Sequence, residues 1–269
     1  MRRSNSRSGA HEWWAQYFDA QYLREYEPLF SLERDRREVA RVMELLGLPA
    51  GSRILDVPCG QGRHAHLLGE TGFRVDGFDY SRQLLSRARR RGTGPMLHYI
   101  RGDMRQLPAR WTGQFDAVLN LFTSFGFFAD PADDRTVMHE FARVLRHDGT
   151  LLWHGASRDG VMSRFLARDW WVSRDGTMVG QERSFDPLSG VLTVESRWSR
   201  KHRGGKRAHR IRLYTATRLA ELCADAGLIV EEAYDGWLDR PLRRRSSEML
   251  LVARKRTARR KLPPRARHS

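Results

Sequence analysis

The sequence predicts an α/β protein built on a doubly wound, mostly parallel sheet of seven strands, with an inserted antiparallel cap and an N-terminal helical lid. Across residues 47–156, and again across 215–253, short apolar runs alternate with stretches of helical periodicity. That order is typical of a parallel sheet whose strands are joined by crossover helices. Between these two parts, residues 157–214 read as strands separated by turns, which indicates that the cap is an insertion into the sheet domain.

The N-terminal segment precedes the sheet and is expected to form the lid. Residues 11–46 are helical in pattern and rich in aromatic side chains. Their second half is amphipathic, with Val39, Val42 and Leu46 on one face, and Gly47 ends it. The segment 1–46 is therefore predicted to be a basic tail followed by a helical lid.

The elements of the sheet domain follow in chain order. Strands are expected at 53–57, 73–79, 97–101, 115–121 and 149–155, with helices near 63–70, 81–91 and 132–146. After the insertion, Thr215 caps a helix that Gly227 ends, and strands at 228–234 and 247–253 complete the sheet. The cap is predicted to be a three-stranded meander, with turns at 186–190 and at the pair Gly204–Gly205.

The formal net charge of +16 comes largely from the two ends of the chain. Residues 1–10 and 254–269 contain eleven basic residues and no acidic one, and 254–269 is predicted to be a disordered basic tail. We interpret both stretches as solvated tails, with contact to a nucleic acid as the alternative.

Location and metal content are predicted from what the composition lacks. The sequence has no apolar leader region and no apolar run of membrane-spanning length, which predicts a cytoplasmic protein without a membrane partner. The two cysteines, Cys59 and Cys223, indicate neither a disulfide framework nor a metal cluster, so no metal site is expected. The oligomeric state stays open, with a dimer as one alternative.

The segment ILDVPCGQGRH, residues 54–64, joins the first strand to a glycine loop. Gly60, Gly62 and Ala65 match the pattern G-x-G-x-x-G/A, and Asp79 lies 19 residues after Gly60 at the end of the next strand. A carboxylate at that place binds ribose hydroxyls, so the pattern fits a nicotinamide dinucleotide as well as other adenosine ligands.

Asp56, four residues before the first glycine, decides between these ligands. A pyrophosphate on the loop would lie close to this carboxylate, and two anions in a partly desolvated crevice repel strongly. An ammonium group would be attracted instead. S-adenosylmethionine meets both requirements, because it has a ribose for Asp79 and a methionine tail with an amino group and a sulfonium. A carboxylate that only caps local loop amides is the alternative for Asp56.

Three motifs make residues 40–156 resemble the class I S-adenosylmethionine-dependent methyltransferases. ILDVPCGQG corresponds to their motif I, GFDYS to the ribose-binding motif, and RGDMRQLP to the segment beside adenine. The resemblance extends more loosely over the cap, toward small-molecule N- and O-methyltransferases with an antiparallel cap and a tyrosine-bearing N-terminal helix. It implies a Rossmann-like core that binds S-adenosylmethionine.

The resemblance also implies which residues bind the cofactor. Asp103 would accept a hydrogen bond from the adenine amino group, with Met104 on the ring, and the end of the fourth strand would lie under the sulfonium. The full set is Tyr22, Asp56, Pro58, Gly60, Gly62, Arg63, Asp79, Tyr80, Asp103, Met104, Asn120, Leu121 and Phe122.

The acceptor side is predicted from aromatic and basic residues near the expected cleft, and the cap is expected to cover the mouth of that cleft. The candidates are Tyr17, Phe125, Arg158, Trp170 and Trp171. For each aromatic residue a plain core role is the alternative, and for Arg158 a solvated helix face.

No general base is identified in the sequence. Similar deoxysugar N-methyltransferases carry a histidine near the position of Phe127, where this chain has phenylalanine. His154, at the end of the fifth strand, is the one candidate, and a histidine buried in the core is the alternative.

The sequence therefore predicts methyl transfer to a small molecule, an amine or a hydroxyl of a natural product, by in-line displacement. Asn120 is followed by Leu121, Phe122 and Thr123 and not by two prolines and an aromatic residue, which argues against nucleobase amino methylation. Three alternatives remain: a tRNA or RNA methyltransferase that uses the basic tail, an NAD-dependent oxidoreductase, which Asp56 disfavours, and a protein that only senses S-adenosylmethionine.

Overall fold

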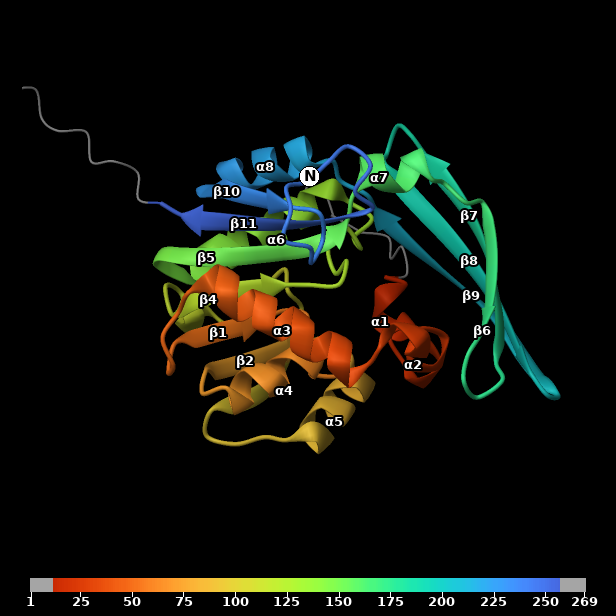
Figure 1. Ribbon diagram of the computed structural model, residues 1–269, viewed down its shortest axis with the longest axis horizontal. Helices are drawn as coiled ribbons and strands as arrows, with labels where there is room; N and C mark the ends of the chain where they lie inside the picture. The colour runs from red at the N-terminus through yellow and green to blue at the C-terminus, as the bar shows by residue number, and fades with distance from the viewer. Residues whose placement is uncertain (1–11, 257–269) are drawn as a thin grey trace, which may run out of the picture.

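The computed structural model describes residues 12–256, which form a large sheet flanked by helices and a smaller second sheet (Figure 1). The large sheet has the order β10-β11-β5-β4-β1-β2-β3, and only β11 runs against its neighbours. Its strands are β1 (Arg53–Asp56), β2 (Arg74–Asp79), β3 (Leu97–Arg101), β4 (Phe115–Asn120), β5 (Leu145–Ala156), β10 (Leu228–Tyr234) and β11 (Glu248–Lys255). The predicted fold class is confirmed.

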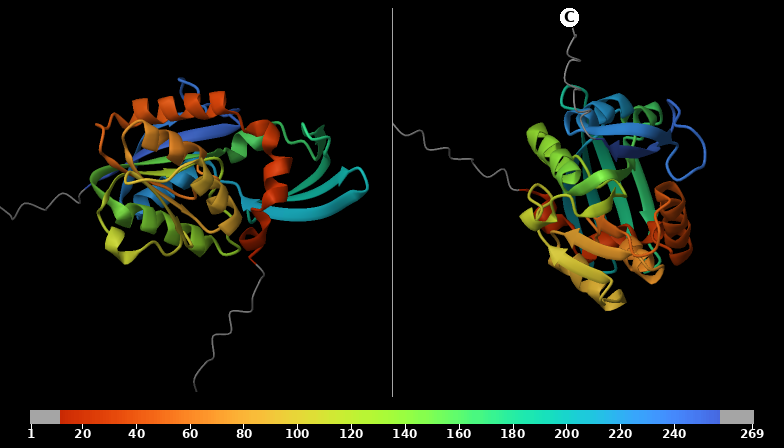
Figure 2. Two further views of the ribbon diagram at one scale, coloured as in Figure 1. Left: turned by 90° about the horizontal axis from the view of Figure 1, so that it is seen from below. Right: turned by 90° about the vertical axis from the view of Figure 1, so that its left-hand side faces the viewer.

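Helices cover both faces of the large sheet (Figure 2). The helices α3 (Leu32–Leu46), α4 (Arg63–Glu70) and α5 (Arg82–Arg91) pack on one face, and α6 (Pro131–Val144) and α8 (Ala216–Asp225) on the other. Short 3-10 helices lie at Glu27–Leu29 (η1) and Ala109–Trp111 (η2). Because successive strand residues point to opposite faces, Ile54 of β1 packs in the first layer and Leu55 in the second.

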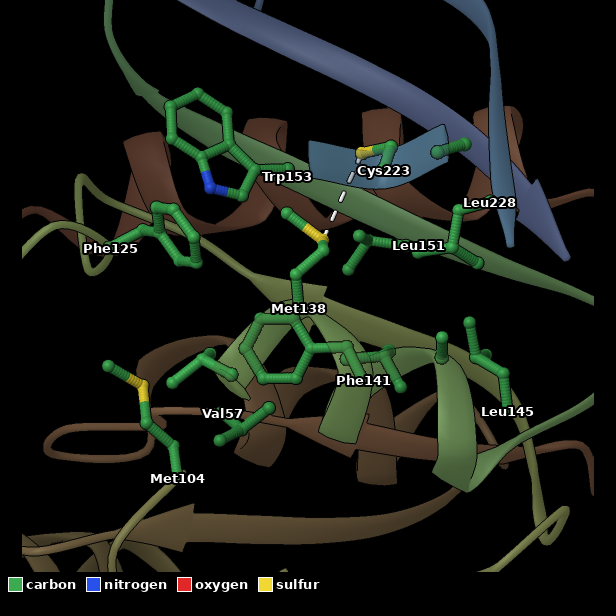
Figure 3. Close-up of a cluster of buried hydrophobic side chains, with 14 of the residues drawn as sticks. Val57, Met104, Phe125, Met138, Phe141, Leu145, Leu151, Trp153, Cys223 and Leu228 are labelled. Carbon is green, nitrogen blue, oxygen red and sulfur yellow. Dashed lines mark hydrogen bonds between the residues drawn. The ribbon is translucent and has the colours of Figure 1, made fainter. Parts of the chain in front are cut away.

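The second layer contains a core of large side chains (Figure 3). Met138 and Phe141 of α6 meet Leu151 of β5 there, and the sulfur of Cys223 on α8 lies 3.9 Å from that of Met138. All four side chains are at most 1% exposed. Their spacing along α6 and β5 explains why both elements were predictable from apolar periodicity alone.

The lid consists of α1 (Trp14–Tyr17) and α2 (Ala20–Glu25), which lie between the large sheet and the cap (Figure 1). Asp19 begins α2 by accepting a hydrogen bond from the amide of Tyr22, and Ser31 begins α3 in the same way with Arg34. Gly47 ends α3 in a left-handed conformation, as the sequence predicts.

The cap contains four strands, not the three predicted, and follows the short helix α7 (Arg158–Ser163). The strands β6 (Arg168–Val172), β7 (Met178–Asp186), β8 (Val191–Arg200) and β9 (Arg203–Arg212) form an antiparallel sheet in chain order. The prediction missed β6 because its sequence, RDWWV, has no alternation of polar and apolar residues. Its two tryptophans point to opposite faces: Trp170 is 69% exposed, whereas Trp171 is half-buried.

The predicted turn at Gly204–Gly205 is also wrong, because both glycines lie inside β9. The chain turns earlier, at Lys201, which has a positive φ of 53°. Gly205 pairs with Trp198 of β8, and a Cβ added to it would lie 2.8 Å from the indole nitrogen. The glycine therefore makes room for a tryptophan ring and does not form a turn.

The end of the sheet extends beyond the predicted boundary at residue 254. β11 continues through Lys255, whose ammonium donates to the carbonyl of Leu145, and Arg254 and Arg256 both pair with Glu231. Three of the basic residues assigned to the tail are therefore tied to the sheet. The remainder of the predicted tail, 257–269, and the N-terminal residues 1–11 lie outside the described residues.

No helix among residues 12–256 combines the length and the apolar character needed to cross a membrane.

One face of the cap sheet holds the lid. The indole of Trp171 donates to the carbonyl of Glu25 at 3.0 Å, and the hydroxyl of Ser173 donates to that of Arg24 at 3.0 Å. From β9, Arg207 pairs with Asp19 at 3.1 Å. On the opposite face the side chains of Trp170, Val172 and Met178 are more than half exposed.

We expect Trp171→Ala to lower the free energy of unfolding by about 1–3 kcal/mol, because it removes a half-buried indole and leaves a lid carbonyl unpaired. Limited proteolysis should then cut first within residues 12–31. Trp170→Ala is the matched control, since its ring lies on the exposed face of the same strand. Equal melting temperatures for the two variants would show that the indole does not hold the lid.

Candidate functional site

A cavity lies where β1, β2 and β4 end, and the lid closes it. Eleven of the thirteen predicted cofactor-binding residues line it: Tyr22, Asp56, Pro58, Gly60, Arg63, Asp79, Tyr80, Asp103, Met104, Leu121 and Phe122. The other two, Gly62 and Asn120, lie behind the surface of the cavity. Gly62 is the N-cap of α4, and Asn120 donates from its side chain to the carbonyl of Val57 at 2.8 Å.

The glycine loop has the shape that its sequence requires. Gly60 and Gly62 adopt positive φ angles of 55° and 73°, which side chains disfavour. A Cβ on Gly62 would also lie 2.5 Å from the hydroxyl oxygen of Tyr99 and 2.9 Å from the Cβ of Ala88. This glycine is therefore needed twice, for the turn and for the close packing of α4 against the sheet.

Asp79, the last residue of β2, binds the amide of the glycine loop and so holds the loop against this strand, a role the sequence did not indicate. One carboxylate oxygen accepts the amide of Gly60 at 2.8 Å, and the other accepts the amide of Ser81 at 2.7 Å. Burial raises the pKa of this carboxyl to about 6, although the backbone hydrogen bonds oppose the shift. Asp79 lines the cavity, and a carboxylate can accept more hydrogen bonds than these, so it can also accept ribose hydroxyls.

Asp56 is a buried acid with an unsatisfied oxygen. The residue is 2% exposed, and its Oδ2 has no hydrogen-bond partner among the described residues. Burial raises its pKa to about 7; Arg63 lowers the pKa, whereas the charge of Asp79 raises it further. A buried carboxylate in this state is stabilised by a cationic ligand, so the site fits the ammonium group of S-adenosylmethionine.

Arg63 does not neutralise Asp56, because its own charge is already shared. Its Nη1 lies 2.6 Å from Asp35 and 2.7 Å from Glu38, both on α3. Its guanidinium carbon lies 4.7 Å from the ring centroid of Phe122, and its Nη2 is buried without a partner among residues 12–256. Neither acid was predicted, and their only signal in the sequence is their place on the polar margin of an amphipathic helix.

His64, also unpredicted, completes this cluster. Its Nε2 lies 2.7 Å from Glu38, and burial together with Arg63 lowers its pKa to about 4 despite that carboxylate. His64 is therefore neutral at physiological pH and donates its Nε2 proton to Glu38. It lines the cavity but is a weak base.

Asp103 reaches the cavity but is held by a neighbour that the sequence did not single out. Arg105 contacts both of its oxygens, at 2.6 Å in the closest case, and also pairs with Asp133 and Glu12. An adenine amino group would share this carboxylate with the guanidinium. Arg105 also covers the ring of Phe128 at 4.5 Å, which places the Asp103 segment against the aromatic wall of the cavity.

That aromatic wall forms the lid side of the cavity. Its members are Trp14, Phe18, Tyr22, Phe30, Phe127 and Phe128. Trp14 packs edge-on against Tyr80 at 4.8 Å, and Phe18 packs edge-on against Tyr22 at 5.0 Å. Phe18 and Phe30 were missed, because a run of aromatic residues in a helical segment does not show which of them face inward.

The predicted acceptor-side residues do not line this cavity. Phe125 is 1% exposed and packs on Trp153 in the core (Figure 3). Tyr17 is buried under the guanidinium of Arg207, 3.9 Å from its ring centroid. Arg158 lies over Phe185 at 5.3 Å, and the two tryptophans of β6 lie beyond the lid.

His154, the candidate base, does not line the cavity either. It is 1% exposed, its ring stacks on Trp237 at 4.6 Å, and its Nδ1 accepts the amide of Phe122 at 3.3 Å. The alternative of a buried core histidine describes its surroundings better.

Comparisons with known proteins find a matching family and relatives with the same fold. The family model described as "Methyltransferase domain" matches residues 54–149. The dTDP-3-amino-3,4,6-trideoxy-alpha-D-glucopyranose N,N-dimethyltransferase of Streptomyces venezuelae is 30% identical over 188 residues, which cover 61% of this chain and 76% of the relative. The chain spans only 43% and 20% of the lengths of two other curated relatives that it matches.

Two solved structures share the fold. The CcbJ methyltransferase from Streptomyces caelestis has a TM-score of 0.75 at 18% identity, with 87% of this chain and 96% of that chain covered. The SAM-bound amino pentose methyltransferase CalS10 from Micromonospora echinaspora has a TM-score of 0.68 at 23% identity, with the same coverage.

Asp56→Asn should weaken the binding of S-adenosylhomocysteine, because the ammonium loses its charged partner. In the wild type, affinity should fall as the pH drops below about 7, since the acid must lose its proton to bind a cation. Calorimetry from pH 5 to pH 8 measures both effects, and the variant should show a flatter profile. Asp76→Asn is the control, because this acid of β2 pairs with Arg53 and does not line the cavity.

Cofactor affinity is expected to rise with pH, whereas the free energy of unfolding without ligand should fall as the pH rises. The folded-state pKa of Asp56 lies above the ordinary value of 3.8, so its stabilising contribution is complete below pH 4 and is lost as the pH rises to about 7. At pH 8 the Asn variant should therefore melt at a higher temperature than the wild type. A lower melting temperature at pH 8 would contradict the description of Asp56 as a destabilising buried charge.

Proposed function

Because the chain belongs to the class I S-adenosylmethionine-dependent methyltransferases, we propose that it methylates the amino group of a small molecule, with an amino sugar as the favoured class of acceptor. The observation that carries this proposal is the contrast between the two sides of the cavity. Titratable groups gather at the cofactor end, while the lid side is an aromatic wall. The named activities of the Streptomyces relatives support the acceptor class.

When bound, S-adenosylmethionine supplies an electrophilic methyl group on a sulfonium. Asp56 would pair with its ammonium and Asp79 with its ribose, and Asp103 and Met104, which also line the cavity, would flank its adenine. The aromatic rings of the lid favour a cation through their quadrupoles and exclude water. Most of the rate acceleration would then come from holding donor and acceptor in line.

An amine acceptor suits this cavity, because none of the described residues that line it is a suitable base. His64 is a weak base, and burial keeps the hydroxyl of Tyr22 protonated by raising its pKa. The two acids with pKa values near neutrality, Asp56 and Asp79, belong to the cofactor end. A neutral amine needs no base to attack, because its proton can leave to water after transfer, whereas a hydroxyl usually needs one.

We propose that the protein acts in the cytoplasm on a diffusible acceptor, with the basic tail as a solvated extension. The RNA methyltransferase alternative loses part of its support, because Arg254, Lys255 and Arg256 are engaged with the sheet. The oligomeric state stays a separate question, since the proposed chemistry needs only one copy of the chain.

The test of the acceptor class is turnover with labelled S-adenosylmethionine on matched pairs of sugar nucleotides that carry an amino group or a hydroxyl at the same carbon. We expect transfer to the amine only, with kcat/KM rising with pH until the acceptor ammonium has lost its proton. Transfer to the hydroxyl partner at a comparable rate would contradict the proposal. Asp56→Asn serves as the inactive control.

The role of the tail is tested by deleting residues 257–269, which removes five basic residues and no acid. We expect cofactor affinity and methyl transfer to remain within about twofold of the full chain, because a solvated tail has no part in the cavity. If the tail instead binds phosphates, the affinity of the full chain for RNA should fall steeply as salt is added. The deletion should then reduce the slope of log K against log[salt] by several units. Methyl transfer to bulk tRNA that is lost on truncation would favour the RNA alternative.

A further inference from the structure

We propose that His154 is a positioning residue, which holds the turn Phe122–Thr123 in the shape that presents Phe122 to the cofactor cavity. His154 lies behind the cavity, where its ring and its backbone carbonyl each accept one hydrogen bond from an amide of the turn. The inference does not depend on the identity of the acceptor, because it concerns the wall of the cofactor site.

The turn after β4 is conformationally strained. Phe122 and Thr123 have φ angles of 60° and 58°, and both are non-glycine residues in the left-handed region. For Thr123 the conformation is especially unfavourable, because its side chain is branched at Cβ. Such pairs persist where the surroundings dictate the backbone, and they gather at functional sites.

His154 supplies acceptors for both amides of this turn. The amide of Phe122 donates to its ring Nδ1 at 3.3 Å, and the amide of Thr123 donates to its carbonyl at 3.0 Å. A third bond closes the arrangement, since the hydroxyl of Thr123 accepts the amide of Ala156 at 3.1 Å. His154 of β5 thus accepts hydrogen bonds from the two amides that follow β4, where the chain turns out of the sheet.

The shape of this turn places the Phe122 ring. The ring contacts the guanidinium of Arg63, at 4.7 Å, and the ring of Phe30, at 5.7 Å, and Arg63 also lies 5.8 Å from the Phe30 ring. All three side chains line the cavity. A relaxed turn would move the Phe122 ring away from Arg63, which would then keep only the more distant contact with Phe30.

The surroundings of His154 fit one tautomer. Because Nδ1 accepts, the ring proton belongs on Nε2, and the carboxylate of Glu248 on β11 lies 3.3 Å from that nitrogen. Pairing with His154 lowers the pKa of Glu248, so the carboxylate stays charged. A proton on Nδ1 would face the donor N–H of Phe122 and break the bond.

The other charged groups near the ring lie across Trp237, which stacks on His154. His64 of α4 is 6.2 Å from that indole and contacts Glu38 of α3, which in turn pairs with Arg34. Burial keeps His64 neutral, so it adds no charge to the ring of His154 at physiological pH.

The test compares His154→Asn with His154→Gln. An Asn carbonyl oxygen can occupy the place of Nδ1 and accept the Phe122 amide, whereas a Gln amide reaches the place of Nε2. We expect the Asn variant to bind S-adenosylhomocysteine within about threefold of the wild type and the Gln variant to bind about tenfold more weakly, as for loss of one hydrogen bond. If His154 only fills space, the larger Gln should be the better substitute, and that reversed order would overturn the proposal.

Adding Thr123→Gly to the Gln variant tests the strain directly. Glycine adopts the left-handed conformation without penalty, so the affinity lost in His154→Gln should be partly restored when position 123 is glycine. An equal loss with threonine and with glycine at position 123 would overturn the proposal.

A measurement on the wild type covers the case in which the variants do not fold. Nitrogen-15 spectroscopy of the histidine rings should show Nδ1 of His154 unprotonated and Nε2 protonated, with and without S-adenosylhomocysteine. A proton on Nδ1 in the folded protein would overturn the proposal.

Discussion

Two carboxylates buried at the ends of adjacent parallel strands are the constraint on which the site depends. β1 and β2 run in the same direction in register, so Asp56 and Asp79 end at the same edge of the sheet. The glycine loop between them folds back so that Gly60 donates to Asp79, and both acids leave bulk water. Two acids in one desolvated crevice favour a ligand that carries a positive charge and hydroxyl donors.

The arginine near these two acids does not remove their preference for a positively charged ligand. The charge of Arg63 acts on Asp56, but Asp35 and Glu38 hold this guanidinium on the side of α3. Within the part of the chain that the structure describes, Asp56 therefore keeps an oxygen without a partner, although the chain is rich in arginine. A guanidinium paired directly with Asp56 would remove the reason to bind an ammonium, so the acidic face of α3 contributes to ligand choice from outside the cavity.

The lid connects this chemistry to the cap. Its inner face supplies aromatic residues to the cavity, and its outer face packs on β9, where Arg207 covers Tyr17 and pairs with Asp19. Within residues 12–256 the cap contributes no side chain to the lining of the cavity. The expectation that the cap covers the mouth of the cleft stays a prediction; the cap contacts the lid, and the lid lines the cavity.

The sequence by itself determined the sheet, the glycine loop and the two acids, because each follows from local periodicity or from a short motif on one strand and one turn. It could not determine which aromatic residues line the cavity or what His154 contacts. These features depend on segments that are far apart in the chain, such as Phe122 and His154 or Trp171 and Glu25. Only tertiary packing brings such pairs together, and so only the structure could separate the residues that touch the cavity from those that hold its walls.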